Sequence, residues 1–487
     1  MQSPSRSIAT GDLDPAEFRR AAAQAVEIVA RYLDDPSAWP VLSPHLPGHL
    51  KDALPAEAPE HGEPLERLLA DFEQLVVPHS THWNHPGFLA YFATSSSGAG
   101  VLAELLIAAL NVNAMVWRSG PAQTELEEVT LDWLRRLIGL DDDAWDGAIN
   151  DTASTSTMYA LAAARESVEG LDARRQGLAG RSEVPRLRVY CSEEAHSSVD
   201  KAAITLGIGH ENVVKVATDV LLSMDASALA RAIDADRRAG FQPVAVVATV
   251  GSTSTTAIDP VPAIADICGR EHIWLHVDAA YGGSAAMLPE MRHILDGVER
   301  ADSIVVNPHK WLFVPMDCSV LYTRRPDMLR RAFSLVPAYL ETPGTGDARN
   351  LMDYGLALGR RFRALKLWFV MRAFGADGLR ARIREHLRIA RAAGEWIEAE
   401  PGWELVAPVQ FSVAVFRFRR DGLDEAALDA LNARIIERVN DSGEVFLAQT
   451  RVRGRLAIRI AIGNIRTEER HVRRAWDLLR AATAQID

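Results

Sequence analysis

The chain has 487 residues, of which 48% are hydrophobic, so it can bury a large core, and its length favours two or three structural units. Its formal charge of −12, without a compact basic stripe, argues against a nucleic acid or an anionic membrane as partner. The polar N-terminus, the absence of a long apolar run, and three widely spaced cysteines predict a cytoplasmic protein with buried thiols.

The first 95 residues are expected to form an arm with little core of its own. From Asp14 to about Leu33, apolar residues recur three and four positions apart after an Asp-Pro start, which predicts an amphipathic helix. A proline-rich stretch favours extended chain, and the helical pattern resumes at LERLLADFEQLVV. Because an arm of this kind often packs on a second subunit, residues 1–95 predict a dimerisation segment.

Residues 96–374 are expected to form a large α/β domain. Short β-branched runs alternate with helical stretches, which indicates βαβ units and a largely parallel sheet. The predicted strands are RLRVYC, NVVKVAT, PVAVVATV, IWLHVDA, SIVVN and CSVLYT. The Arg-rich segment RRFRALKLWFVMR is interleaved with apolar residues and predicts a helix with one buried face.

Residues 375–487 are expected to form a small α+β domain. Long helices are predicted over LRARIREHLRIARAAGEWIEAE and LDEAALDALNARIIERVN. They alternate with the predicted strands WELV, SVAVFRFR, VFLAQT and RLAIRIAIG.

The strand SIVVN delivers a lysine into the turn that follows it. In SIVVNPHKW the strand ends at Asn307, and Lys310 follows where ligands gather at the carboxyl ends of an open sheet. A solvated surface lysine is an equally good interpretation of Lys310 alone. The neighbours His309 and Trp311 favour the other interpretation. A nearby cation and an apolar ring lower the pKa of an amine and free it to form a Schiff base.

A carboxylate stands at the end of the preceding predicted strand. In IWLHVDAAYGGSA, Asp278 is followed by small residues that leave space beside it. Asp in this position is often a helix N-cap. The alternative is a carboxylate that pairs with the pyridinium nitrogen of pyridoxal phosphate (PLP) and maintains the ring as an electron sink. Asp278 and Lys310 on neighbouring strands are more specific together than either is alone.

Three further segments offer groups for such a cofactor. Asn150 to Ser154 precede a helical run, where small hydroxyl residues either cap the helix or mark an anion site suited to a phosphate. His196 follows RLRVYC, and its flat ring could stack on a pyridine, although most lone histidines are surface or core residues. Ser252, Thr253 and Ser254 follow another strand with their hydroxyls.

The chain resembles the group II PLP-dependent decarboxylases of fold type I, most closely the aromatic-L-amino-acid decarboxylases. The strings HVDAAYGGSA, NPHKW, DCS and LGRRFRALKLW carry the resemblance, which extends from about Phe72 to Leu479. It implies an α/β, PLP-dependent transferase-like large domain with a mostly parallel seven-stranded sheet, the N-terminal helical arm and the small α+β domain. It also implies a homodimer with shared active sites.

The resemblance assigns roles to the residues around Lys310. Lys310 would carry PLP, Asp278 would hold the ring nitrogen, and His196 and Ala280 would sandwich the ring. Thr253 would lie near the rim of the ring. The phosphate would be bound by Thr152, Ala153, Ser154, Asn307 and His309. The family uses no metal.

Tyr339 lies in LRRAFSLVPAYLETPGTGDARN, whose polar, Pro- and Gly-rich end predicts a mobile lid. Taken alone, it is an ordinary surface tyrosine. In the decarboxylases that the chain resembles, tyrosine at this position returns a proton to the substrate carbon after CO2 departs, and phenylalanine accompanies aldehyde formation. Tyr339 therefore favours an amine product, because a phenol with a pKa near ~10 is protonated at neutral pH.

The segment THWNHPGFLAYFATSSS matches the aromatic-lined substrate pocket of the family. The matching residues are Trp83, Tyr91, Phe92 and Thr94. A flat apolar slot binds an aromatic side chain and leaves a glutamate carboxylate without a partner. The same segment carries His79, His82 and His85, but flanking prolines and the lack of a nearby acidic or thiolate ligand argue against a metal site.

The substrate itself depends on residues that vary within the family. Asn113 and Met115 stand where well-known animal members carry larger apolar or aromatic residues. Gly359 stands where tyrosine-preferring plant members carry serine, and it leaves room for an indole. Tryptophan is therefore expected, with phenylalanine, tyrosine and DOPA open. The alternatives are an oxidative, aldehyde-forming reaction, decarboxylation of a polar amino acid, which Asn113 could favour, and a catalytically silent PLP-fold protein.

Overall fold

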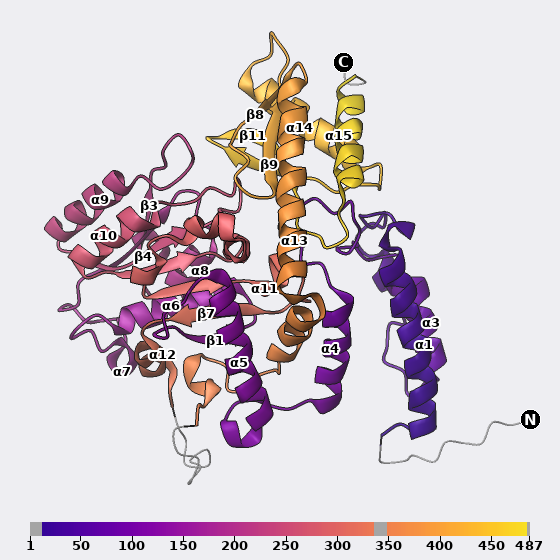
Figure 1. Ribbon diagram of the computed structural model, residues 1–487, viewed down its shortest axis with the longest axis horizontal. Helices are drawn as coiled ribbons and strands as arrows, with labels where there is room; N and C mark the ends of the chain where they lie inside the picture. Colours follow the sequence, from indigo (N-terminus) through magenta and orange to yellow (C-terminus); the bar gives the residue numbers. More distant parts are fainter. Residues whose placement is uncertain (1–11, 336–347, 485–487) are drawn as a thin grey trace, which may run out of the picture.

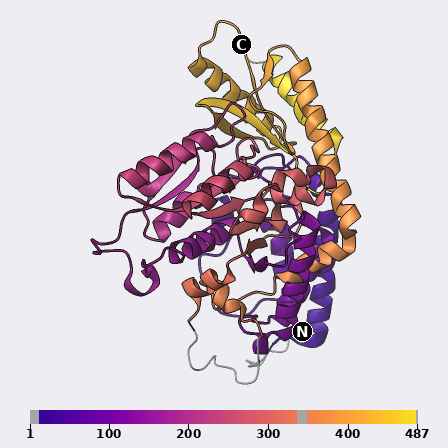
Figure 2. The ribbon, with the colours of Figure 1, turned by 60° about the vertical axis from the view of Figure 1, so that its left-hand side comes forward.

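The computed structural model describes residues 12–335 and 348–484. A seven-stranded sheet and a four-stranded sheet are each accompanied by helices, and the long helix α13 (Ala364–Ala399) runs past both (Figures 1 and 2). The helix bends at Gly375, where φ is +63°. Within the described ranges, no helix is long and apolar enough to cross a membrane.

The N-terminal arm contains the first predicted helix. Helix α1 (Pro15–Asp34) begins at Asp14, whose carboxylate accepts from the backbone N–H groups of Ala16 and Glu17. This N-cap and the proline at the first helical position explain why the helix starts there. The second predicted helix, LERLLADFEQLVV, forms α3 (Leu65–Asp71) and then continues as a π-helical turn, η2 (Phe72–Val76). The remaining elements are η1 (Pro36–Ala38) and α2 (His49–Ala53).

The large sheet is mostly parallel, which confirms the predicted fold class. Its order is β1-β7-β6-β5-β4-β2-β3, and only β7 is antiparallel to its neighbours. The strands are β1 (Asp146–Asn150), β2 (Leu187–Ser192), β3 (Val213–Val216), β4 (Gln242–Thr249), β5 (Trp274–Asp278), β6 (Ser303–Val306) and β7 (Ser319–Thr323). The six strands predicted from sequence are present. The seventh, β1, is a short DGAIN segment that lacks the β-branched run of the others.

Helices cover the large sheet, so β5, β6 and β7 are buried at every position. The longer helices are α4 (Gly98–Leu110), α5 (Pro121–Ile138), α6 (Ala153–Glu166), α8 (Ser198–Thr205), α9 (Ala226–Arg238), α10 (Val261–Glu271) and α12 (Pro326–Phe333). The short ones are η3 (Trp117–Ser119), α7 (Ala173–Gln176), η4 (His210–Asn212), η5 (Gly282–Met287), η6 (Pro289–Leu295), η7 (Val298–Arg300), α11 (Pro308–Trp311) and η9 (Leu351–Tyr354).

The C-terminal part is the predicted α+β unit with an antiparallel sheet of order β10-β11-β9-β8. Its elements are β8 (Trp403–Leu405), β9 (Val413–Phe418), α14 (Glu425–Asn440), β10 (Ala448–Val452), β11 (Arg455–Ala461) and α15 (Glu469–Ala484). One face of this sheet contributes Val413 and Val415 to the same hydrophobic core as the large sheet. The two parts are therefore continuous in their packing.

Two sequence predictions need correction in detail. The Arg-rich helix starts at Ala364, so the four preceding residues, which include three arginines, lie outside it. The strand predicted at VFLAQT begins only at Ala448. The three cysteines are buried, as predicted.

Candidate functional site

The predicted site residues gather at one edge of the large sheet. Strands β1, β2, β4, β5 and β6 point the same way, so their carboxyl ends share this edge. Each strand is followed by one predicted segment: residues 151–154, 193–196, 250–254, 279–280 and 307–310, respectively. Tyr339 lies outside the described residues, and of the predicted lid segment, residues 329–333 belong to helix α12.

Lys310 lies in α11, directly after β6, and is largely enclosed. Its Nζ is 5.0 Å from the centre of the Phe92 ring, and the next residue, Trp311, is fully buried. Burial lowers the pKa of the Lys310 amine, Asp278 opposes this shift, and the positive charge of Arg459 reinforces it. A lysine in this setting loses its proton more readily than a surface lysine and is a better nucleophile.

Asp278 ends β5 and is 6% exposed. One of its carboxylate oxygens accepts from the backbone N–H of Ala280 at 3.1 Å. Among the described residues, no basic side chain forms an ion pair with Asp278. The negative charge of Asp278 acts on Lys310 and His196, where it partly offsets the lowering of the pKa that burial causes in both groups. The carboxylate is therefore poised for a cationic partner that the protein itself does not supply.

The residues predicted for the phosphate surround the start of α6. Thr152 is the N-cap, and its own side chain bonds no helix N–H. The first turn of α6 therefore presents backbone N–H groups without side-chain caps, together with the positive end of the helix dipole. Ala153 and Thr152 are partly exposed, and Ser154 is exposed. This arrangement suits an anion.

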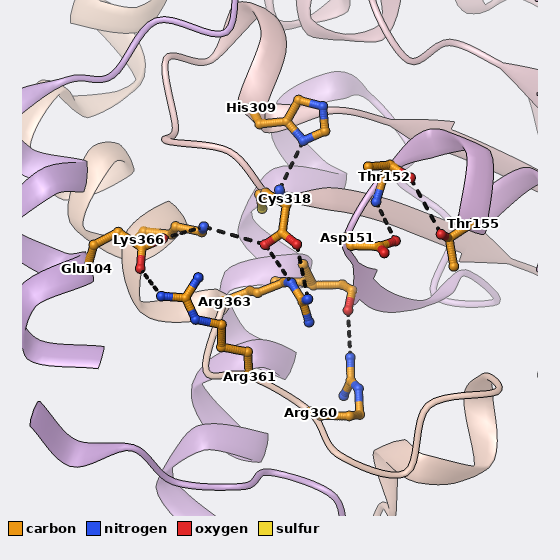
Figure 3. Close-up of polar contacts among 12 residues, drawn as sticks. Glu104, Asp151, Thr152, Thr155, His309, Cys318, Arg360, Arg361, Arg363 and Lys366 are labelled. Atoms are coloured by element: carbon orange, nitrogen blue, oxygen red, sulfur yellow. Dashed lines mark hydrogen bonds and ion pairs between the residues drawn. The ribbon is translucent and has the colours of Figure 1, made fainter. Parts of the chain in front are cut away.

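His309 and Asn307 form a buried pair beside this helix start. The Nδ1 of His309 accepts from the Cys318 N–H at 2.9 Å (Figure 3). Burial lowers the pKa of His309 to about 3, so the ring is neutral and carries its proton on Nε2. This Nε2 faces the Asn307 amide at 3.4 Å, while the Asn307 Oδ1 is buried without a partner. An amide turned so that its oxygen accepts from Nε2–H leaves its NH2 group in the position without a partner, where it is a donor suited to an anion.

An ion-pair network fixes the backbone behind this pair (Figure 3). Asp317, next to Cys318, accepts two bonds from Arg363 at 2.9 and 3.1 Å. Lys366 is fully buried between Asp317 and Glu104, 2.6 Å from the latter. Arg363 and Lys366 of LGRRFRALKLW are therefore neutralised by partly buried carboxylates, and they hold the loop that orients His309.

Of the residues predicted for the aromatic pocket, Phe92 lies beside Lys310. Phe92 stacks on Tyr281 at 3.8 Å, and Tyr281 stacks on Trp311 at 4.6 Å. Trp83 and Tyr91 are half exposed and stack on each other at 6.0 Å. Thr94 is partly exposed. His196 and Thr253 are exposed at the same edge of the sheet, and Ala280 is buried.

Asn113, Met115 and Gly359 form a second group. The Asn113 Oδ1 accepts from the Arg360 N–H at 2.9 Å, and its Nδ2 is 3.6 Å from the Met115 sulfur. A Cβ added to Gly359 would lie 3.9 Å from the same Nδ2. In the described part of the chain, no hydrogen bond or ring contact joins this group directly to Lys310 or Phe92.

The three evenly spaced histidines have separate surroundings. His79 stacks on His45 at 3.8 Å, His82 bonds the Tyr32 hydroxyl at 3.1 Å, and His85 accepts from the Gly87 N–H. Among residues 12–335 and 348–484, no group of three or more potential ligands is arranged to hold a metal ion.

Two residues of the site were missed in the sequence. Arg459 is 3% exposed, and its Cζ lies 4.7 Å from the Phe92 ring centre. Tyr281 joins Phe92 to Trp311 in the aromatic stack. The sequence did contain a signal for Arg459, because it interrupts the apolar run of the predicted strand RLAIRIAIG. A charged residue in such a run is rarely buried unless it has a partner or a functional role.

The donor set matches PLP, and the fold and site define a PLP-dependent enzyme. An enclosed lysine with a lowered pKa, a buried carboxylate without a basic partner, an orphaned amide and an uncapped helix start lie at one sheet edge. Bound PLP supplies an electron sink for the breaking of a bond at the substrate α-carbon.

Comparison with known proteins agrees with this assignment. The pyridoxal-dependent decarboxylase conserved domain matches residues 47–419. A tryptophan decarboxylase of Camptotheca acuminata is 38% identical over 96% of this chain and 95% of its own length. The aromatic-L-amino-acid decarboxylase of Sus scrofa is 39% identical over 97% of this chain and 98% of its own. The crystal structure of Oryza sativa TDC with PLP and tryptamine has a TM-score of 0.93 at 36% identity, covering 98% of this chain and 99% of that one.

The chain belongs to the pyridoxal-dependent decarboxylase family, within its aromatic amino-acid decarboxylases. It is a PLP-dependent decarboxylase, as the sequence predicted.

Proposed function

We propose that this enzyme removes the carboxyl group of an aromatic L-amino acid, with tryptophan as the favoured substrate, and releases the amine and CO2. The observation that carries the proposal is the aromatic wall, the segment that holds Trp83, Tyr91 and Phe92, because its Phe92 ring lies beside Lys310. The centre of that ring is 5.0 Å from the Lys310 Nζ, and Tyr91 and Trp83 stack on each other at 6.0 Å in the same segment. A flat apolar slot binds an aromatic side chain favourably, whereas a polar side chain there would lack hydrogen-bond partners.

The positions of the residues at the sheet edge support the cofactor roles that the resemblance implies. Lys310 would hold PLP covalently, Asp278 would pair with the ring nitrogen, and His196, Ala280 and Thr253 would contact the ring. The phosphate would be bound at the start of α6 and by the amide beside His309. Its ligands would be Thr152, Ala153, Ser154, Asn307 and His309.

The choice of tryptophan rests on Gly359. Among the described residues, only the Asn113 amide approaches the position of a Cβ at Gly359, at 3.9 Å, so this position leaves space that we assign to the recess for an indole. The resemblance implies that the Asn113 to Trp117 region serves the pocket of a second subunit, and among the described residues Asn113 and Met115 form no hydrogen bond with Lys310. Single pocket groups separate close substrates by ~1–3 kcal/mol, so a preference rather than strict selection is expected.

The amine product rests on Tyr339. Once CO2 has left, the α-carbon needs a proton, and a tyrosine hydroxyl holds one at neutral pH. Without that donor, dioxygen would act as the oxidant at this carbon and water would release the nitrogen, so that the products would be the aldehyde, ammonia and hydrogen peroxide.

A homodimer is the expected assembly. Helix α1 packs mainly on α3, and both lie at one edge of the molecule (Figure 1). Helix α4 exposes a row of leucines: Leu102 at 56%, Leu105 at 53% and Leu110 at 59%. Contiguous apolar faces of this kind are normally covered by another chain. A Leu105→Glu variant should sediment as a monomer, whereas Val220→Glu, at an apolar position outside α4 that is 82% exposed, should leave the dimer intact.

The experiment that tests the activity is a substrate panel with the PLP-loaded enzyme. Tryptophan, tyrosine, phenylalanine, DOPA and glutamate are incubated separately, and CO2, amine, aldehyde and peroxide are measured. We expect amine without peroxide, with the highest kcat/KM for tryptophan. If no aromatic amino acid released CO2, the proposal would fail. Lys310→Ala should abolish turnover and the visible absorbance of PLP, and Tyr339→Phe should shift the product toward aldehyde.

A glycine pair tests the recess. Gly359→Ser should lower kcat/KM for tryptophan relative to tyrosine by about tenfold or more, because the added side chain narrows the recess. Gly269→Ser is the matched control, since nothing lies within 4 Å of a Cβ there. Equal losses for both substrates would contradict the assignment of Gly359 to the side-chain pocket.

A further inference from the structure

Arg459 is a buried cation without an acidic partner. It lies on β11 opposite Val415, whose side chain belongs to the core shared with the large sheet, so Arg459 faces the large domain. The guanidinium is 3% exposed, and among the described residues no carboxylate forms an ion pair with it. A buried unpaired charge costs several kcal/mol, so a chain retains one only where it serves a purpose.

The guanidinium joins three segments of the active site. Its Nη1 donates to the Tyr91 carbonyl, and its Nε donates to the Ser254 carbonyl at 3.3 Å. Its plane also contacts the Phe92 ring, with the Cζ 4.7 Å from the ring centre. One side chain therefore ties the aromatic wall and the loop after β4 to the small sheet.

The third nitrogen of Arg459, Nη2, is buried without a partner. The Arg459 side chain and the Lys310 amine both contact the Phe92 ring, and the Lys310 amine is 5.0 Å from the centre of that ring. Two cations thus meet at one aromatic ring, and only one of them, Lys310, is the nucleophile.

We propose that Arg459 is a positioning residue of the active site, which clamps the Tyr91–Phe92 wall and the Ser254 loop and places a fixed positive charge beside Lys310. This role rests on PLP being held by Lys310 but does not depend on which amino acid is the substrate. Arg459 touches the wall and the loop rather than the reacting atoms.

The charge acts on Lys310 together with three other groups. Asp278 on β5 favours the protonated amine, whereas Arg459 on β11 disfavours it. His309 on α11 and His196 before α8 also face the amine, and burial lowers the pKa of both, so they are neutral at pH 7. Arg459 is thus the fixed positive charge that offsets Asp278.

Two variants separate the charge from the clamp. Arg459→Met removes both, whereas Arg459→Lys keeps a positive charge but cannot reach two carbonyls with a planar fork. Arg451→Met is the control, since Arg451 lies on the neighbouring strand with a side chain that is 61% exposed. The first readout is the pH midpoint at which the visible absorbance of the PLP-loaded protein changes, which follows the proton on the Lys310 nitrogen. The second readout is the KM and kcat for the best aromatic substrate.

We expect the pH midpoint to move to higher pH in Arg459→Met and to stay in place in Arg459→Lys. KM should rise about tenfold in both variants, the factor for one lost hydrogen bond to a charged group. Arg451→Met should change neither quantity. An unchanged midpoint in Arg459→Met, or a KM fully restored in Arg459→Lys, would overturn the proposal.

If Arg459→Met does not retain PLP, the test rests on Arg459→Lys. A raised KM at an unchanged pH midpoint would support the positioning role of Arg459, and a normal KM would refute it. The midpoint requires no substrate, so failure of the tryptophan assignment leaves this test intact.

Discussion

Removal of the buried Arg360 guanidinium should destabilise the fold severely. Arg360 and Glu127 are 3.0 Å apart, and their side chains are 8% and 3% exposed. Arg360 also donates to the Ile149 carbonyl at 2.7 Å, and Glu127 accepts from the Ile149 N–H at 2.9 Å. The pair therefore fixes β1 immediately before the segment proposed to bind the phosphate.

Arg360→Met leaves the Glu127 carboxylate buried, with the Ile149 N–H as its one remaining donor among the described residues. Removal of one partner of a buried ion pair typically costs about 3–5 kcal/mol, because an uncompensated charge remains. In the double variant with Glu127→Gln neither charge remains, so the loss should fall short of the sum of the single losses by about 0.5–3 kcal/mol.

The assay is equilibrium urea unfolding of the PLP-loaded protein at constant concentration, followed by circular dichroism. The control is Arg384→Met, which breaks an ion pair of similar length, 2.6 Å, whose side chains are both 51% exposed. It should cost no more than about 1 kcal/mol. A loss below about 1 kcal/mol for Arg360→Met, or strict additivity with Glu127→Gln, would refute the reasoning.

Three further predictions concern burial elsewhere in the chain. Burial lowers the pKa of His386 to about 4, so unfolding takes up a proton below the ordinary pKa of 6.5, and the free energy of unfolding should fall by up to ~1.4 kcal/mol per pH unit from 6.5 toward 4. His386→Gln should flatten that slope in urea titrations between pH 7 and 5, and an unchanged slope would contradict the assignment. A Cβ on Gly282 would lie 2.5 Å from the Val250 carbonyl oxygen, so Gly282→Ala should cost ~1–3 kcal/mol and reduce PLP retention, measured by absorbance after gel filtration. The three cysteines are buried, so a thiol reagent should label none of them rapidly in the native protein and all three after unfolding; rapid native labelling would show that the thiols are accessible.

The local pattern of the chain was sufficient for the cofactor and the architecture. Six strands of the large sheet could be predicted, because buried parallel strands are runs of β-branched residues. Asp278 ends one predicted strand and Lys310 follows the next. Both residues could therefore be predicted at one edge of the sheet, because the carboxyl ends of parallel strands meet there. Strand β1 was not predicted, because DGAIN is short and lacks the run of β-branched residues typical of the other strands; it is buried because neighbouring elements cover it.

Only the tertiary structure decided which charges belong to the site. Arg360, Arg363 and Lys366 look alike in the sequence, yet the fold pairs each with a particular carboxylate far away in the chain. Arg459 receives no such carboxylate and meets the Phe92 ring instead, 367 positions away from it in sequence, by the difference of the two residue numbers. Local propensity carries no record of such contacts, because they arise only when separate strands and loops pack against one another. The sequence by itself thus determined the cofactor and the lysine proposed to carry it, and the packing of the small sheet against the large one determined the electrostatic surroundings of that lysine.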